Sequence, residues 1–582
     1  MQEELHDKRC SNSTVLSTNT QGRLDNSVLH RHFLLEHRFR FFSMAQSEQK
    51  EAHPVTHAED LHSGEAHSKD TVHDAATRGQ ALTGYETLTP WETAKKFKAC
   101  AFYVFLAALS AGTDGYQTGL NAGILANSGF VKQFATEINS KGKPVLASNV
   151  LAAWGSVLPV GQFVANVLLP FVSARLGRKA AMLVCWAILA ASIVGESLAR
   201  EWPHWLVAKF LAGLGLGCMQ ATIPMYITET APTRIRGMAL MSYNLWWTAG
   251  TFFAYVAMEA LSVSHTEDWL IPVYTQWAHI GLMAIIYLIL PESPAWAVAR
   301  GKHDRARKAL TQLYKGVEDF DLEHQMQVLV MLSEHEAEVA AMQSREKWYA
   351  IFQGTDGFRT IVAFWTLVSQ QFTGLVLFST FGAYFFQQAG VGDPFQIKCI
   401  TLSVKIVAAV AVVYFADSVG RRMISCSGTT TMWAMSLLVG ILGVVPRVPA
   451  VNYVFVLFAV IWNIGLTMNG ATGWGFVGEI SSQRLRHYTS GAAAACNAIF
   501  NIGMNQLVPH MVNENEWDWG LKAGWFYAGV GLPFVIAIWL LIPETSGRSH
   551  AELDELFERK IKPWRFHKTE TATQRVVESQ RD

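Results

Sequence analysis

Amide and carboxylate side chains recur at helical spacing inside long apolar stretches of this sequence. Asp114, Gln117 and Asn121 stand at positions i, i+3 and i+7, which share one face of a helix. An amide offers hydrogen-bond donors and acceptors, so a stripe of amides can bind hydroxyl groups. For any single residue, hydrogen bonding between helices is the simpler interpretation, but together the stripes favour a polar centre. Similar positions are Gln162 and Asn166, Asn244 and Trp247, Gln370, Gln371 and Thr373, Asn463, Asn469 and Trp474, and Asn497, Asn501 and Asn505.

The elements that carry these side chains have the length and composition of membrane helices. The chain has 582 residues, of which 50% are hydrophobic and 16% are charged. A membrane helix needs about 20 apolar residues, and about twelve runs meet that need. We therefore predict an all-α membrane protein with twelve transmembrane helices and the lipid bilayer as a partner. The runs cover 101–125, 149–172, 180–199, 205–227, 238–263, 270–291, 358–387, 400–417, 423–445, 451–477, 490–512 and 521–543.

Lys and Arg gather in alternate gaps between these runs. Arg178 and Lys179 follow the second run, and Arg421 and Arg422 follow the eighth. The positive-inside bias then places both termini in the cytosol, which requires an even number of spans. The expected organisation is a disordered cytosolic tail over 1–97, a six-helix bundle over 98–291, a cytosolic linker with short helices over 292–357, a second bundle over 358–543 and a cytosolic tail over 544–582.

The two halves of the chain repeat the same short strings at matching places. RLGRK at 175–179 corresponds to DSVGRR at 417–422, and PESP at 291–294 corresponds to PETSGR at 543–548. Such a repeat predicts two pseudo-symmetric six-helix bundles, with a binding site between them near the bilayer midplane.

Charged residues at the membrane edge are expected to form a latch. Glu229 and Glu479 each end an apolar run, where a carboxylate is costly unless it is paired. We expect Glu229 and Arg234 to pair with Arg178, and Glu479 and Arg484 to pair with Asp417 and Arg421. These pairs would latch the two halves on the cytosolic side in the outward-open state and break when that side opens; the alternative is that they are ordinary interfacial anchors. The expected members are Arg178, Glu229 and Arg234 in the first half, and Asp417, Arg421, Glu479 and Arg484 in the second.

Several strings together resemble a known family. Pro-x-Tyr-x-x-Glu-x-x-Pro at 224–232 and PESP at 291–294 resemble the loops of the sugar porter branch of the major facilitator superfamily. YFFQQAG at 384–390, NEWDWGLKAGWF at 515–526 and the string from Pro543 to Ile561 are similar to fungal maltose permeases and general α-glucoside transporters. The resemblance covers roughly 98–566. It implies a secondary transporter that moves a sugar, an α-glucoside such as maltose or a hexose, across the plasma membrane by alternating access.

The resemblance also implies some of the residues that bind substrate. QQFTG at 370–374 matches the sugar-contacting string of the seventh span, and Asn244 matches an amide of the fifth span. Val376 and Ala471 depart from the family pattern. With the amide stripes, the candidate substrate-binding residues are Gln117, Gln162, Asn244, Trp247, Gln370, Gln371, Trp474, Asn497 and Asn501.

Most charges that proton-coupled members of this branch carry are replaced here. The acids of spans one and two align with Gln117 and Gln162, and the arginine of span eleven aligns with Cys496. Asp114 is the remaining acid, and Lys405 in the eighth run is a second coupling candidate. Two mechanisms stay open: facilitated diffusion, or coupling to a proton through an Asp114–Lys405 pair.

The depth of Lys405 depends on where its helix begins. Matching the repeat starts the helix near Pro394 and places Lys405 in the middle of the span, where an ammonium group is costly. It would then pair with Asp114 or bind an anionic substrate. If the helix starts at Ile400, Lys405 reaches water instead.

Other function classes have less support from the sequence. A transporter of a sugar acid or secreted metabolite on the same scaffold, and a sugar sensor that does not transport, are the alternatives. There is no Gly-rich phosphate loop, nucleophile constellation or metal-ligand cluster, so we expect no enzyme, cofactor or metal site. The net charge is zero, which gives no basis for nucleic-acid binding. We expect a monomer.

Overall fold

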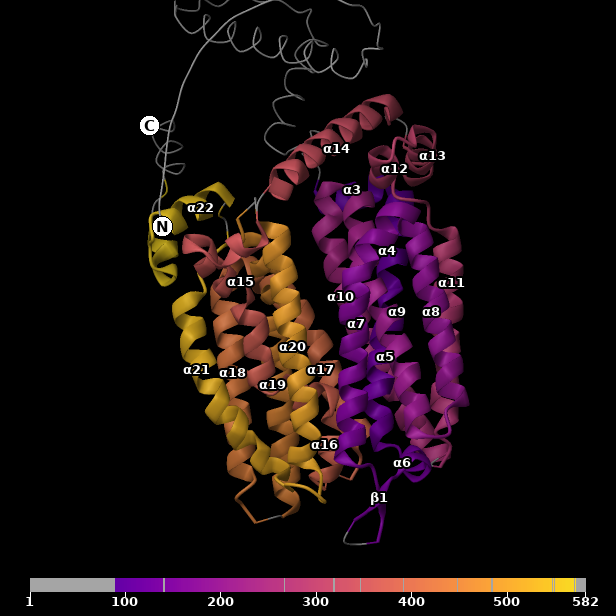
Figure 1. Cartoon of the computed structure of the whole chain (residues 1–582), viewed down its shortest axis with the longest axis vertical. Helices are drawn as coiled ribbons and strands as arrows, with labels where there is room; N and C mark the ends of the chain where they lie inside the picture. Colours follow the sequence, from indigo (N-terminus) through magenta and orange to yellow (C-terminus); the bar gives the residue numbers. More distant parts are fainter. Residues whose placement is uncertain are drawn as a thin grey trace, which may run out of the picture. The chain divides into compact units, whose positions relative to one another are not determined.

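The computed structural model describes residues 89–139, 142–265, 267–317, 320–345, 347–390, 392–446, 448–482, 485–546, 548, 550–569 and 571. These residues form long, roughly parallel helices (Figure 1). Most of the tail expected over 1–97 lies outside them, but residues at its end form the helix α3 (Pro90–Lys96), whose first turn is closed by a capping box between Thr89 and Glu92. A helix is therefore present before the first apolar run.

The first half of the described chain is a set of helices that follow the six predicted runs closely. The first run is divided into α4 and α5 at Ser110. A small hairpin of two antiparallel strands lies between α6 and α7. The elements are α4 (Lys98–Leu109), α5 (Ala111–Gly123), η1 (Ile124–Ala126), α6 (Ser128–Phe134), β1 (Glu137–Ile138), β2 (Pro144–Val145), α7 (Ser148–Leu176), α8 (Arg178–Leu198), α9 (Trp202–Thr230), α10 (Thr233–Ser264) and α11 (Leu270–Ile289).

The linker and the second half follow the same plan. The linker contains short helices, as its patterning predicts, and these pack on one another around Trp296, Leu310 and Met326. The elements are α12 (Pro294–Ala299), α13 (His303–Leu313), α14 (Leu322–Arg345), η2 (Trp348–Phe352), α15 (Gly354–Phe372), η3 (Val376–Thr380), α16 (Gly382–Gln388), α17 (Pro394–Val419), α18 (Arg421–Leu442), α19 (Pro449–Ile480), α20 (Arg486–Val512), η4 (Gly520–Lys522), α21 (Ala523–Leu541), α22 (His550–Glu558) and η5 (Pro563–Lys568).

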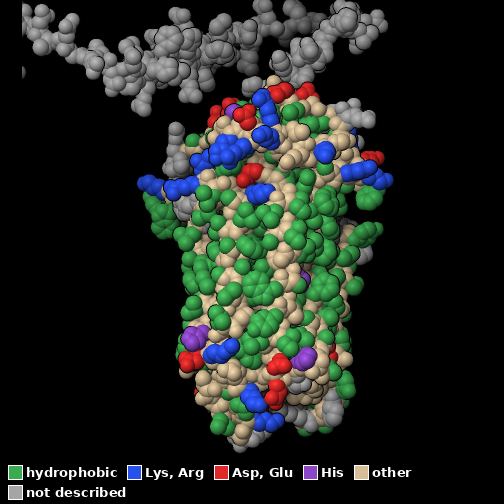
Figure 2. Space-filling model, turned by 90° about the vertical axis from the view of Figure 1, so that its right-hand side faces the viewer, with side chains coloured by type: hydrophobic (Ala, Val, Ile, Leu, Met, Phe, Trp, Pro, Cys, Tyr) green, Lys and Arg blue, Asp and Glu red, His purple; other side chains and the backbone are tan. Residues whose placement is uncertain are grey.

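Within the described residues, eight helical segments are long and apolar enough to cross a membrane. The other four predicted spans miss this criterion for physical reasons. Two of them are broken, α4–α5 at Ser110 and α15–α16 at the π-helical turn η3. The other two, α10 and α20, are long but carry many polar residues. Figure 2 shows a broad belt of hydrophobic side chains between two charged ends on one face of the molecule, which suits a protein embedded in lipid.

Small residues let the broken first span lie against α10. A side chain added at Gly115 would collide with the main-chain oxygen of Trp247, and one added at Gly250 would collide with that of Gly112. Thr251 donates a hydrogen bond across the same contact to the carbonyl of Gly115, at 3.0 Å. This close packing fixes Asp114 and Gln117 on α5 relative to Trp247 on α10.

Hydrogen bonds join the two halves at the end where α7 begins and α20 ends. Asn513 donates to Ser148 Oγ at 2.9 Å and to the carbonyl of Leu146 at 3.1 Å. Gln506 donates to Ser156 Oγ at 2.9 Å, and Gln387 of α16 donates to the carbonyl of Ala126 at 3.3 Å. The halves are thus joined at the end opposite to the predicted latch.

Candidate transport site and charge clusters

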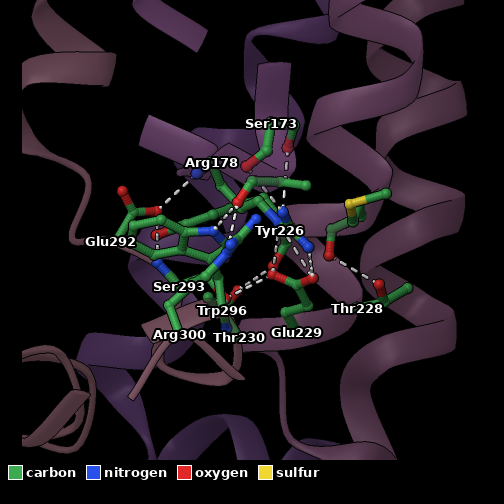
Figure 3. A network of polar contacts seen from close by, with 12 residues as sticks. Ser173, Arg178, Tyr226, Thr228, Glu229, Thr230, Glu292, Ser293, Trp296 and Arg300 are labelled. Atoms are coloured by element: carbon green, nitrogen blue, oxygen red, sulfur yellow. Dashed lines mark hydrogen bonds and ion pairs between the residues drawn. The ribbon is translucent and has the colours of Figure 1, made fainter. Parts of the chain in front are cut away.

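Arg178 and Glu229, two of the three predicted latch residues of the first half, form a compact cluster at one end of α8 and α9 (Figure 3). Arg178 donates from Nε and Nη2 to the carboxylate of Glu229, with a shortest separation of 2.6 Å. Its Nη1 donates to Ser173, and Ser293 Oγ donates to Glu229 Oε2 at 2.5 Å. A two-armed contact of this kind is among the strongest side-chain hydrogen bonds.

A second glutamate, Glu292, completes this cluster and was not among the predicted site residues. It accepts hydrogen bonds from the main-chain amides of Arg178 at 2.8 Å, Lys179 at 3.1 Å and Ser293 at 3.0 Å. The first two of these amides are the unsatisfied donors at the start of α8, so Glu292 caps that helix. Gly177 enters the helix with φ +108°, and a side chain there would collide with Glu292.

The second half repeats this cap with different residues. Glu544 accepts from the main-chain amides of Arg421 at 3.0 Å and Arg422 at 3.2 Å, at the start of α18. Arg421 forms an ion pair with Glu479, as Arg178 does with Glu229. Gly420, with φ +89°, takes the place of Gly177. The signal for Glu292 and Glu544 was present in the sequence, because each follows a proline in the repeated PES and PET strings.

Each of these ion pairs lies within one half, in agreement with the expected partners, and their action as a latch between the halves stays a prediction. Arg178 and Glu229 come from α8 and α9, and Arg421 and Glu479 come from α18 and α19. Arg234 is exposed in the first turn of α10. Arg484 and the side chain of Asp417 lie outside the described residues. The arginine that begins α8 or α18 is directed to the neighbouring helix of its own bundle.

The linker covers the cluster of the first half. Trp296 and Arg300 both donate to the main-chain oxygen of Ala174, at 2.9 and 3.0 Å. Ala174 stands where the second half has Asp417. Burial, together with the negative charge of Glu229, raises the pKa of Glu336 in α14. The helix α14 therefore lies within electrostatic range of this cluster.

Several predicted substrate-binding amides meet between α15 and α20. Gln371 donates to Asn497 Oδ1 at 3.1 Å and accepts from Asn501 at 3.3 Å. Asn501 also accepts from Asn505 at 3.0 Å. Asn497 and Asn501 are only half-buried. This connected set, which we name the amide chain (Gln371, Asn497, Asn501 and Asn505), can exchange an internal hydrogen bond for one to a hydroxyl group.

Gln370 points elsewhere although it is adjacent to Gln371. Its amide donates to Asn469 on α19, and Asn469 donates to Thr429 on α18. All three residues are buried, so Gln370 joins helices within the second bundle. The structure thus separates two neighbouring residues that the sequence placed in one site.

Gln117 is also engaged inside a bundle. It donates at 3.0 Å to Glu196 on α8, and Gln276 on α11 donates to the other carboxylate oxygen at 2.9 Å. Lys209 on α9 forms an ion pair with Glu196 at 3.0 Å, and both side chains are 0% exposed. This buried pair was missed in the sequence, where its signal was a single charge inside each of two apolar runs.

Asp114 and Lys405, the two coupling candidates, approach the same tryptophan from different halves. Asp114 accepts from Gln220 at 3.0 Å and is also hydrogen-bonded to Trp247. Lys405 Nζ lies 5.3 Å from the centre of the Trp247 ring. Among the described ion pairs there is none between Asp114 and Lys405. The indole therefore bridges the two charged groups that the sequence predicted as a direct pair.

The helix of Lys405 begins at Pro394, so the alternative start at Ile400 is wrong. Lys405 lies near the middle of α17, as the repeat predicts. A second lysine, Lys398, precedes it by two turns and was not among the predicted residues. Its Nζ donates to the main-chain oxygen of Phe378 in the π-helical turn η3, at 2.7 Å. Lys398 thus satisfies a carbonyl group that the broken helix leaves free.

The remaining candidates are less engaged. Gln162 is half-buried on α7, and Asn244 is exposed on α10, one turn before Trp247. The side chain of Trp474 lies outside the described residues. Neither Gln162 nor Asn244 is drawn into the amide chain by the described hydrogen bonds.

The structure has two bundles of long helices, a broken first and seventh span, and polar residues where the bundles meet. These features define a membrane transporter of the major facilitator type. The family model for the sugar (and other) transporters matches residues 103–557. The chain belongs to this family, whose members are transporters and not enzymes. A membrane location and a small-molecule sugar substrate follow from that membership.

Curated relatives are similar over most of the chain. The MFS transporter fmqE of Aspergillus fumigatus is 26% identical over 86% of this chain and 96% of its own length. The general alpha-glucoside permease of Saccharomyces cerevisiae is 25% identical over 87% of this chain and 82% of its own length. An inward-open structure of the xylose transporter XylE from E. coli superposes with a TM-score of 0.65 at 18% identity, covering 78% of this chain and 99% of that one. This last likeness establishes the fold.

Proposed function

We propose that this protein carries a sugar, in the class of α-glucosides and hexoses, across the plasma membrane by alternating access. The amide chain between α15 and α20 supports this proposal most directly. Its amides are linked in series, and Asn497 and Asn501 are half-buried. A hydroxyl group that replaces one of these internal bonds finds a donor and an acceptor together. The relatives named glucose transporter and alpha-glucoside permease agree with this class.

The joint between the halves supports the alternating-access step. The described hydrogen bonds between α7 and α20 lie at one end, whereas the ion pairs at the other end each stay within one half. If the charged end faces the cytosol, as the positive-inside bias predicts, this arrangement is the inward-facing state. Both termini are then cytosolic.

We propose further that transport is not coupled to a proton. Asp114 is held by Gln220, Trp247 and Thr118, the last at 3.4 Å, and Gln117 and Gln162 cannot carry a proton. A carboxylate that drives symport must gain and lose a proton with each cycle. The hydrogen bonds engage Asp114 with Gln220, Trp247 and Thr118 of its own half, which supports a structural role for this carboxylate.

The test is uptake in a host that lacks its own sugar transporters, followed by purified protein in vesicles. Labelled glucose and maltose should enter with wild-type protein and not with the Asn501→Ala variant at the same low concentration. A protonophore, with internal pH controlled, should leave the initial rate unchanged. Uptake that collapses with the protonophore contradicts the uncoupled mechanism, and absence of uptake for every sugar contradicts transport.

A further inference from the structure

Two lysines occupy the same face of α17. Lys398 and Lys405 are seven residues apart, which places them two helical turns from each other on one side. Both approach aromatic rings of α10, which belongs to the other half. Lys398 Nζ lies 5.8 Å from the centre of the Tyr255 ring, and Lys405 Nζ lies 5.3 Å from that of Trp247. Two positive charges therefore lie along the contact between α10 and α17.

The two ammonium groups differ in what satisfies them. Lys398 donates to the main-chain oxygen of Phe378 at 2.7 Å. Lys405 has the indole face of Trp247 as its partner, and the described hydrogen bonds and ion pairs give it no carboxylate and no carbonyl group. A cation over an indole ring recovers part of the cost of leaving water, but not the whole of it. The charge of Lys405 is thus only partly compensated.

The acidic groups on the neighbouring elements are occupied or distant. Asp114 on α5 accepts from Gln220 at 3.0 Å and from Trp247. Glu259 on α10 and Asp393, which precedes α17, interact with each other. Glu259 lies twelve residues after Trp247, and Asp393 lies twelve residues before Lys405. At 1.5 Å per residue, twelve residues correspond to about 18 Å. The described carboxylates near Lys405 are thus engaged with other groups, which leaves its ammonium group open to an anion from outside the chain.

We propose that this anion is the carboxylate of the substrate, and that the protein prefers an acidic sugar, such as a hexuronate, to the neutral hexose of the same ring. The proposal rests on the proposed transport function and refines its substrate class. Lys405 binds the carboxylate, while Trp247 offers an apolar face for the C–H groups of the ring. Asn244, one turn away and exposed, is placed to meet a hydroxyl group.

The test compares labelled glucuronate with labelled glucose in vesicles that contain purified protein. Wild-type protein should take up glucuronate with a KM about tenfold lower than that of glucose, the size expected for one hydrogen bond to a charged group. Lys405→Gln should remove that preference, and Lys405→Arg should keep most of it because the charge remains. Lys522→Gln, at an exposed lysine of η4, is the matched control and should behave as wild type.

The outcomes separate this inference from the proposed function. Uptake of glucose without a preference for glucuronate overturns the inference and leaves sugar transport standing. Uptake of neither solute, nor of maltose, overturns both. Because Lys405→Gln could fail to fold, glucuronate is also added to wild-type protein in a thermal unfolding assay, where it should raise the Tm more than glucose does. If Asp114→Asn restores lost transport of both solutes in Lys405→Gln, Asp114 is the partner of Lys405 and the inference is overturned.

Discussion

In the first half, helices α5, α8, α9 and α11 converge on a carboxylate and an ammonium group, whereas in the second half α15, α18, α19 and α20 meet through neutral amides. Glu196 and Lys209 are fully buried, and their bonds are charge-assisted. The amides of the second half are partly exposed at Asn497 and Asn501. A buried ion pair is costly to separate, while the net contribution of an amide hydrogen bond is about 1 kcal/mol. The first half is built to stay fixed, and the second can exchange partners.

The largest effect is expected when the buried charge pair is broken on one side. Glu196→Gln leaves the ammonium of Lys209 buried without its counterion, and the free energy of unfolding should fall by about 3–5 kcal/mol. Chemical unfolding of the purified protein in detergent measures this. The double variant Glu196→Gln with Lys209→Met should recover much of the loss. If the single variant is as stable as wild type, the first half is not held by this pair.

A smaller loss is expected from Gln370→Ala in the second half. This change leaves buried Asn469 short of a donor, which should lower the free energy of unfolding by about 1–3 kcal/mol. The KM for sugar should stay within about twofold of wild type, because Gln370 joins helices and does not belong to the amide chain. A large rise in KM with unchanged stability would show that Gln370 faces the substrate after all.

The neighbouring residue should respond in the opposite way. Gln371→Ala opens the amide chain at its centre, and the KM for sugar should rise about tenfold, corresponding to about 1.4 kcal/mol. The change in unfolding free energy should not exceed about 1 kcal/mol. Initial uptake rates across a range of sugar concentrations give the KM. Equal behaviour of the two glutamine variants would remove the distinction between a fixed core and an exchangeable site.

The smallest effects are expected at the charged end. Arg178→Lys replaces a two-armed contact to Glu229 by a single one and should cost about 1 kcal/mol of stability. Arg421→Lys is the matched variant in the second half, where the arginine is 37% exposed compared with 14% for Arg178. Solvent weakens the more exposed pair, so its loss should be the smaller of the two. Thermal unfolding of both variants at the same pH makes the comparison.

The sequence predicted the helical membrane architecture and the repeat because apolar run length and charge alternation are direct consequences of the bilayer. It also predicted which arginine and glutamate would meet at each edge. It did not predict the caps formed by Glu292 and Glu544, because spacing along the chain does not reveal which carboxylate the amides at a helix start will meet. Contacts of Arg178 with residues 51 and 114 positions away depend on the tertiary fold.

Within the membrane, the prediction of polar positions was more reliable than the prediction of their partners. Gln370 and Gln371 are adjacent, so they lie about 100° apart on the helix and enter different environments. Gln117 donates a hydrogen bond to Glu196 in the third span. Composition alone does not reveal how deeply the carboxylate of Glu196 is buried. The interruption of the seventh span at η3 is marked locally only by Gly374, with φ +105°.

The caps that follow Gly177 and Gly420 allow basic residues to stand at the first turn of α8 and α18 without destabilising that turn. Basic residues at the beginning of a helix oppose the positive end of its dipole and weaken its first turn. Yet Arg178 and Arg421 stand there, in the gaps where basic residues favour retention on the cytosolic side during insertion. Glu292 and Glu544 resolve this conflict, since each supplies a negative group to the same amides. Each half can therefore carry its orientation signal at a helix start without losing that turn.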